Sequence, residues 1–213
     1  MKYWLECLGL AALITLINSY PLPLPLPIFK QLIIPMVIFG LSLILGLRFP
    51  DVDLYTPGLK HRSAVTHSAL LPWLVTLLGN PAILAGLSIG MAIHIFADIF
   101  PKAWIGGALV KMPLFGSLGK LSPYWLTLNC LVCLAIGMQS VSINGDSVKY
   151  GSLCLSLIIL LWYLIKKEKS MPPLLSAFMI IGVLCWYHYL PDLSSFSLDT
   201  LTAGAGKSLR SAG

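Results

Sequence analysis

Long apolar stretches constrain this chain more than any other feature of its sequence. Several runs of about 18 residues carry almost no charged side chain, which is enough for a helix to cross a bilayer. Only 10% of the 213 residues are charged, against roughly 25% in soluble domains, and the mean hydropathy is +0.87. These values exclude a soluble enzyme, a disordered protein and a nucleic-acid-binding domain, and they predict an all-α polytopic membrane protein.

The apolar runs predict about seven transmembrane helices in one membrane domain, residues 1–190, followed by a flexible polar tail at 191–213. The first run begins like a signal peptide. Only one lysine precedes it and no small-residue cleavage site is evident, so we interpret it as a retained span. The expected spans are 3–19, 28–47, 64–78, 82–100, 124–141, 150–165 and 174–190.

The basic residues predict the orientation of these spans, because Lys and Arg collect in cytoplasmic loops. Fourteen Lys and Arg oppose eight Asp and Glu, for a net charge of +6. Most of the basic residues fall on the side of the N-terminus, which is therefore expected in the cytoplasm, with the C-terminal tail outside. That side holds Lys2, Arg48, Lys60, Arg62, Lys102, Lys111, Lys120, Lys166, Lys167 and Lys169, and the other holds Lys30, Lys149, Lys207 and Arg210.

Two apolar-flanked motifs each have a functional and a structural interpretation. Cys130-x-x-Cys133 has the spacing of a redox or metal pair, but its apolar surroundings favour simple packing. The alternating prolines of 21–27 enforce an extended connection. That connection is either a recognition motif for a partner or, as we favour, a stiff loop between two spans.

Two motifs near the C-terminus are similarly ambiguous. His188 and Asp192 could form a metal pair, although the aromatic residues around them favour an interfacial belt. The AGAGKS segment at 203–208 resembles a phosphate-binding loop. Leu201 stands where that loop needs its first glycine, so we favour a flexible tail.

Ionisable residues are scarce in this chain, and they gather around residues 48–100. Three of the four histidines and three of the eight acidic residues lie there. Ionisable groups at membrane depth are costly and are typical of functional sites. The members of this cluster are Asp51, Asp53, His61, His67, His94 and Asp98.

The spacing within the cluster predicts how its members face. Asp51 and Asp53 are two residues apart after a proline, so an extended chain would point both the same way. His94 and Asp98 are four apart on an apolar helix and therefore share one face. We also expect Ser63 to cap the third helix, which would place His67 in its first full turn.

The strongest turn signal, Gly79-Asn80-Pro81, predicts that the third and fourth runs fold back as an antiparallel pair. His67 would then meet His94 and Asp98 at one membrane edge, next to the loop of the two other aspartates. The spacing Gly86-x-x-x-Gly90 would permit the close backbone approach that this pairing requires.

Together these donors predict a metal site at one membrane edge, with all six residues as candidate ligands. Mixed nitrogen and oxygen donors suit Zn²⁺ best, with Mn²⁺ or Fe²⁺ as alternatives. A metal that keeps a water ligand lowers the pKa of that water to about 7 and supplies a hydroxide nucleophile. Some of the aspartates could instead orient the histidines without binding the metal.

Three motifs in this order resemble the YdjM-like family of predicted inner-membrane metal-dependent hydrolases, over about residues 30–105. They are Pro50-Asp51-x-Asp53, His61-Arg62-x-x-Thr66-His67-Ser68 and His94-x-x-x-Asp98. The family often has a histidine soon after the second aspartate, where this chain has Leu54 and Tyr55. The resemblance implies metal-dependent hydrolysis in a bacterial inner membrane. A fainter similarity to zinc-dependent phospholipases C points to a lipid or lipid-linked (phospho)ester as substrate.

Arg62, Asp53 and His67 are the candidate catalytic residues. The Arg62 guanidinium could hold a phosphate or stabilise developing negative charge, or it could only extend to lipid head groups. We interpret Thr66 and Ser68 as caps or hydrogen-bonding partners. The expected partner is a membrane lipid or lipid-linked substrate, and no nucleic acid.

Two other functions remain open at this level. One is a non-catalytic membrane scaffold or stress-response protein with a structural metal site. The other is a metal-ion transporter, which is disfavoured because the donors gather at one membrane edge and none lies at mid-depth.

Overall fold

The computed structural model describes residues 2–19, 29–99, 109–113, 116–163 and 165–166. All of them belong to the first of two structural units, Met1–Leu174. Several sequence predictions lie outside the described residues: the proline-rich connection at 21–27, the span at 174–190, the pair His188 and Asp192, and the tail at 191–213 with its AGAGKS segment.

The described part of the chain is mostly helical, as the sequence predicts. Its α-helices are α1 (Lys2–Ser19), α2 (Ile34–Arg48), α3 (Leu70–Val75), α4 (Pro81–Ile99), α5 (Ser122–Ile143) and α6 (Asp146–Tyr163). A π-helical turn, η1 (Phe29–Ile33), precedes α2, and short 3₁₀ helices occur at η2 (Pro50–Tyr55), η3 (Thr76–Leu78) and η4 (Gly119–Leu121). Strands β1 (Lys111–Met112) and β2 (Gly116–Ser117) form a small antiparallel hairpin.

Within the described residues, three helices are long and apolar enough to cross a membrane: Lys30–Arg48, Pro81–Ile99 and Gly119–Ile143. They coincide with the expected spans at 28–47, 82–100 and 124–141. The expected spans at 3–19 and 150–165 correspond to shorter apolar helices, Trp4–Ser19 and Ser147–Tyr163. These lengths are compatible with a membrane protein.

The third apolar run differs from its prediction as a continuous helix over 64–78. Residues 64–69 form turns, and helical structure covers only α3 and η3. Pro72 explains the late start, because proline lacks an N–H and clashes with the carbonyl four residues before it, so a helix accepts it only in the first turn. Ser63 therefore does not cap a helix. Its backbone N–H donates to Asp53 Oδ2 at 2.8 Å instead.

The predicted close approach at Gly86 and Gly90 exists, but its partner is α2 and not the third run. A Cβ on Gly86 would collide with the Phe39 carbonyl, and one on Gly90 would collide with the Leu43 carbonyl. Because the contacts advance together along both helices, α2 and α4 run parallel. The absence of side chains here lets the two backbones touch.

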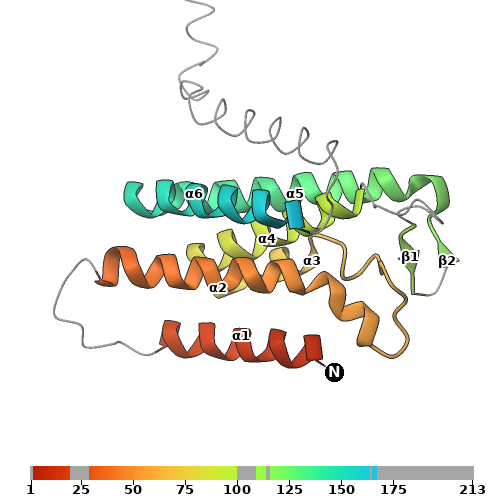
Figure 1. Cartoon of the computed structure of the whole chain (residues 1–213), viewed down its shortest axis with the longest axis horizontal. Coiled ribbons are helices and arrows are strands. Elements are labelled where there is room, and N and C mark those ends of the chain that lie inside the picture. Colours follow the sequence, from red (N-terminus) through yellow and green to blue (C-terminus); the bar gives the residue numbers. More distant parts are fainter. Residues whose placement is uncertain (1, 20–28, 100–108, 114–115, 164, 167–213) are drawn as a thin grey trace, which may run out of the picture. The chain divides into compact units, whose positions relative to one another are not determined.

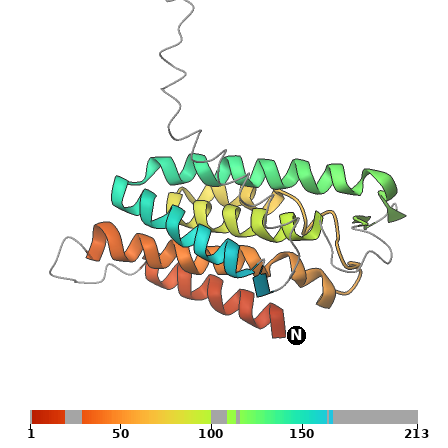
Figure 2. The same ribbon diagram turned by 45° about the horizontal axis from the view of Figure 1, so that its top comes forward.

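Helix α4 lies between α2 and α5 (Figures 1 and 2). Cys130 of α5 contacts the Ala92 carbonyl, and Gly137 packs on Ile89, so α5 runs antiparallel to α4. Nearly every residue of α4 from Ala82 to Ala97 is buried. A helix that is apolar on all sides belongs in such a central position.

Polar contacts show which helix ends lie together. Trp4 Nε1 at the start of α1 donates to Thr56 Oγ1, just after η2, at 3.2 Å. At the other end of α1, Asn80 Nδ2 donates to Asn18 Oδ1 at 2.6 Å. We call the end that holds η2 and the C-terminus of α4 the site end.

The turn at 79–81 is confirmed. Gly79 has a left-handed backbone (φ 67°), and Asn80 Oδ1 accepts the N–H groups of Ala82 and Ile83, which caps α4. Residues 63–80 therefore return the chain from the site end to the opposite end, although little of this segment is helical.

Candidate metal centre

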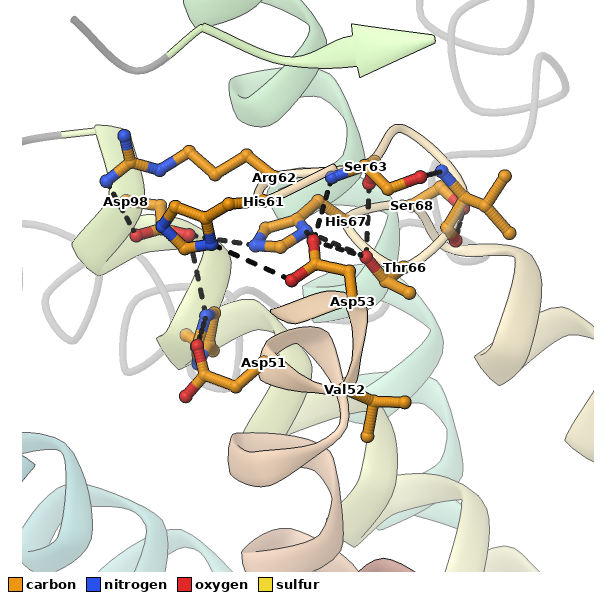
Figure 3. Close-up of polar contacts among 12 residues, drawn as sticks. Asp51, Val52, Asp53, His61, Arg62, Ser63, Thr66, His67, Ser68 and Asp98 are labelled. Carbon is orange, nitrogen blue, oxygen red and sulfur yellow. Dashed lines mark hydrogen bonds and ion pairs between the residues drawn. The ribbon is translucent and has the colours of Figure 1, made fainter. Parts of the chain in front are cut away.

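All six predicted donors lie together at the site end, in one connected set of polar contacts (Figure 3). Asp98 Oδ2 lies 2.9 Å from His67 Nε2 and 3.4 Å from His94 Nε2. These three residues can hold a metal ion, since their ligand atoms all lie within 4.8 Å of one another. Asp51, Asp53 and His61 lie beside this group.

The two aspartates of η2 face different partners. Asp51 Oδ1 lies 3.7 Å from His94 Nε2, whereas Asp53 Oδ2 lies 3.5 Å from His67 Nδ1. The expectation that an extended chain points both the same way was wrong. Residues 50–55 form a 3₁₀ helix, in which residues two apart leave in different directions.

His94 must carry its hydrogen on Nδ1 when it is neutral. That nitrogen lies 2.9 Å from the Leu47 carbonyl oxygen, which can only accept a hydrogen bond. The Tyr163 hydroxyl oxygen, at 3.2 Å from the same nitrogen, can share this hydrogen as a second acceptor. His94 Nε2 is left with a lone pair, and it faces the carboxylates of Asp98 and Asp51.

Neutral His67 also carries its hydrogen on Nδ1, and the reason is its contact with Thr66. The Thr66 hydroxyl has one hydrogen, and it lies near Asp53 Oδ2 (3.1 Å) and the Ser63 carbonyl (3.2 Å), both of which only accept. Thr66 Oγ1 must therefore accept from His67 Nδ1, at 3.0 Å. The lone pair of His67 Nε2 then faces Asp98 Oδ2.

Two lone pairs directed at one carboxylate repel it unless a proton or a metal cation lies between them. The N–O separations of 2.9 and 3.4 Å resemble those of ligands that surround one ion at about 2.1 Å each. With neutral histidines, the three carboxylates and Arg62 carry a net charge of two negative units, which one divalent cation would neutralise. The residues present therefore fit a divalent metal ion.

Asp53 lies on the buried side of the centre, next to His67. Its side chain is fully buried, and Oδ2 accepts the Ser63 N–H and the Thr66 hydroxyl. Burial by itself would raise the pKa of Asp53, but favourable contacts with His61, Ser63, His67 and Thr66 hold the pKa below its ordinary value. Asp53 is thus ionised at neutral pH and fixes the ring of His67.

Arg62 is held in a strained backbone conformation. It is the only residue other than glycine with a positive φ (61°) among those the structure describes. The Arg62 carbonyl accepts the Lys111 N–H, and the Ala64 N–H donates to the Lys111 carbonyl, each at 2.9 Å. These hydrogen bonds hold residues 62–64 against strand β1. In this position Arg62 Nη2 donates to Asp98 Oδ1 at 3.3 Å.

Exposure differs across the centre. The side chains of His67, His94 and Asp53 are at most 1% exposed, whereas those of Asp98, Asp51 and Arg62 are 16–18% exposed and that of His61 is 45% exposed. The two histidines are thus enclosed, while Asp98 and its charged neighbours can be reached from solvent.

Sequence reasoning missed three contributors to the centre: the Leu47 carbonyl, the Tyr163 hydroxyl and the backbone of Lys111. Two of them are main-chain groups, which every residue type carries, so the sequence holds no signal for them. Tyr163 stands beside Trp162 at the end of an apolar helix, where it is easily interpreted as an interfacial residue.

Comparison with models of known families, with curated proteins and with solved structures finds no match to this chain.

Proposed function

We propose that this chain is a membrane-bound, metal-dependent hydrolase that acts on a lipid or lipid-linked (phospho)ester at the bilayer surface. The observation that carries the proposal is the convergence of the His67 and His94 Nε2 atoms on one carboxylate oxygen of Asp98, at 2.9 and 3.4 Å. The same residues carry the resemblance to the YdjM-like hydrolases, and membership of that family is part of the proposal.

In this proposal His67, His94 and Asp98 hold the metal, with Asp51 beside them as a further donor. Two imidazoles and a carboxylate suit Zn²⁺, with Mn²⁺ or Fe²⁺ as alternatives. The ion would acidify a water molecule and so supply a hydroxide nucleophile near pH 7. An open coordination position favours catalysis over a purely structural role, and the partial exposure of Asp98 is consistent with one.

The surrounding residues would prepare the substrate and the ligands. Asp53 and Thr66 keep the proton of His67 on Nδ1, which leaves Nε2 free to bind the ion. Arg62 lies where it can orient the oxygens of a phosphoryl or acyl group. In the reaction a water oxygen bonds to phosphorus or to the carbonyl carbon, the bond to the alcohol oxygen breaks, and the alcohol leaves with one proton of the water.

The test is elemental analysis of the purified chain, combined with assays of phospholipid and lipid-phosphate hydrolysis in mixed micelles. We expect at least one transition metal per chain in the wild type. His67→Ala and Asp98→Ala should lose most of the metal and all hydrolysis, while Ser142→Ala, an exposed position at the opposite end of α5, should keep both.

Two outcomes would contradict the proposal in different ways. A folded wild-type chain that holds no metal would remove the metal centre altogether. A chain that binds metal, needs it to fold and hydrolyses nothing in the panel would instead support a membrane scaffold with a structural metal site.

The seven-span topology with a cytoplasmic site is the second part of the proposal. Its support is the distribution of charge: Arg48, Arg62, Lys111 and Lys120 belong to segments at the site end. Lys30 and Lys149 lie near the starts of α2 and α6, at the opposite end. The positive-inside rule then places the site end in the cytoplasm.

A cysteine introduced as Tyr55→Cys should react only with reagents that reach the cytoplasm, and a reporter fused after residue 213 should face outside. Labelling of that cysteine from outside intact cells would contradict the orientation. A cytoplasmic reporter would contradict the count of seven spans.

A further inference from the structure

The two oxygens of the Asp53 carboxylate have different surroundings (Figure 3). Oδ2 accepts the Ser63 N–H at 2.8 Å and the Thr66 hydroxyl at 3.1 Å. Oδ1 is buried, and no hydrogen-bond donor reaches it from the described residues. A buried carboxylate oxygen that accepts no hydrogen bond is costly, and such a group in a folded protein calls for a specific explanation.

His61 is the nearest group that could explain it. Its Nδ1 lies 3.7 Å from Asp53 Oδ1, which is beyond the usual range of a hydrogen bond. The distance is instead compatible with two ligands of one ion, because metal–nitrogen and metal–oxygen bonds of about 2.0–2.2 Å allow separations up to roughly 4.2 Å. Since Oδ2 is held by two donors, the direction of Oδ1 toward His61 is fixed.

This pair is separate from the group formed by His67, His94 and Asp98, to which neither Asp53 nor His61 belongs. The ring of His67 lies between the two sets. Its Nδ1 faces Asp53 Oδ2 at 3.5 Å, and its Nε2 faces Asp98 Oδ2 at 2.9 Å. An ion at either set would therefore have the other as its neighbour.

We propose that Asp53 Oδ1 and His61 Nδ1 are ligands of a second divalent cation, beside the ion of the His67–His94–Asp98 group. The inference deepens the proposed function and rests on it for the first ion. With only two protein ligands, this second position takes its remaining ligands from water or from the substrate. It is the weaker of the two positions, and the half-exposed ring of His61 gives it access to solvent.

Charge identifies the class of substrate. One divalent ion neutralises the two negative units of the centre, so a second ion leaves two positive units. A phosphomonoester dianion neutralises that excess, a phosphodiester halves it, and a neutral carboxylic ester does neither. The substrate class is therefore a phosphoester, with Arg62 as an additional contact for its oxygens.

Metal stoichiometry tests the second site without any assay of activity. The full-length chain in detergent is stripped of metal and titrated with Zn²⁺ by calorimetry, with and without inorganic phosphate, and the bound metal is counted after dialysis. The wild type should bind two ions, the second at least about tenfold more weakly. Phosphate should raise the Zn²⁺ affinity of the second position only. If the second ion helps to bind phosphate, phosphate must strengthen the binding of that ion by the same factor.

His61→Asn should bind one ion with unchanged affinity for the first and no effect of phosphate. Because the His61 side chain is 45% exposed, His61→Asn should keep the fold, and circular dichroism of the same sample checks this. Lys60→Ala, at the exposed neighbouring residue, should still bind two ions. A wild type that saturates below two ions in the presence of phosphate would overturn the proposal, as would a His61→Asn variant that retains two.

Failure of the second site and failure of the proposed function give different results. A chain that binds two ions but hydrolyses no phosphoester keeps the second site and loses the enzymatic function. A chain that hydrolyses phosphoesters with a single bound ion keeps the function and loses the second site.

Discussion

The contact between α2 and α4 and the polar centre at its end are assembled by different forces. In the contact, Gly46, Gly86 and Gly90 leave no room for a Cβ, so the two backbones touch and size alone fixes the spacing. In the centre, hydrogen bonds and charge fix the side chains, and several of these are partly exposed. The contact should therefore govern folding, while the centre should govern metal binding.

The two regions are nevertheless linked in one direction. His94 lies one turn after Gly90 on α4, and Leu47 follows Gly46 on α2. The close approach of the two backbones is what brings the Leu47 carbonyl within 2.9 Å of His94 Nδ1. Damage to the contact should spread to the centre, whereas damage to the centre should leave the contact intact.

The largest effect is expected from Gly90→Ala, because its Cβ would collide with the Leu43 carbonyl, a backbone atom that cannot move aside alone. We expect a loss of about 3 kcal/mol or more in the free energy of unfolding, at the upper end of what overpacking costs, together with loss of metal. Denaturant unfolding in micelles followed by circular dichroism measures this.

Gly9→Ala in α1 is the matched control, since no atom lies within 4 Å of a Cβ placed there. It should leave stability unchanged or raise it by up to about 1 kcal/mol through helix propensity. Equal stability of the two variants would show that size does not fix the contact between α2 and α4.

A smaller effect, confined to the centre, is expected from Thr66→Val. The change keeps the volume of the side chain but removes the acceptor of His67 Nδ1 and a donor to Asp53. Metal affinity should fall about 10–100-fold, as it does when partners behind metal ligands are removed, and the free energy of unfolding should fall by about 1–3 kcal/mol. Metal titration and unfolding of the same sample separate the two quantities.

Thr76→Val serves as the comparison, because Thr76 is exposed in η3 and its hydroxyl donates only to the Trp73 carbonyl among the hydrogen bonds described. Its metal affinity should equal that of the wild type. If Thr66→Val behaves the same way, Thr66 does not orient His67.

The smallest effect is expected from a pair of substitutions at Arg62. Both Arg62→Ala and Arg62→Gly remove the guanidinium that contacts Asp98, so hydrolysis should fall while the metal stays bound. Only glycine adopts φ 61° without strain. The free energy of unfolding of Arg62→Gly should therefore be about 1 kcal/mol larger than that of Arg62→Ala. Thermal unfolding of the two variants measures the difference. Loss of metal from either one would assign Arg62 a structural role.

Much of the helical framework could be predicted from local signals. Apolar runs marked the helices, and Gly79-Asn80-Pro81 marked the turn that returns the chain to α4. That turn, together with the i, i+4 spacing of His94 and Asp98, was enough to predict that His67 meets them. The late start of α3 could also have been predicted, since Pro72 cannot stand inside a helix that begins at residue 64.

The partner of Gly86 and Gly90 could not be predicted in the same way. A glycine pair indicates that some backbone comes close, but every apolar helix in the chain offers a backbone. We predicted the third run as the partner because it is the nearest in sequence, and this was wrong. Its turns and its short helix offer no continuous helical surface on which α4 could pack. The orientation of Asp51 and Asp53 was missed for a related reason, since a 3₁₀ turn and an extended segment have no distinct signature over six residues.

The sequence by itself determined that the chain is apolar and mostly helical in its described part, that three histidines and three aspartates gather around residues 48–100, and which of them meet. These properties depend on residue type and on spacing along a helix, both of which are local. Tertiary structure decided which nitrogen of each histidine faces Asp98, and that Asp53 and His61 do not belong to the group formed by His67, His94 and Asp98. The acceptor that orients His94 is a main-chain carbonyl 47 residues away in the sequence, and only the packing of α2 on α4 brings it there.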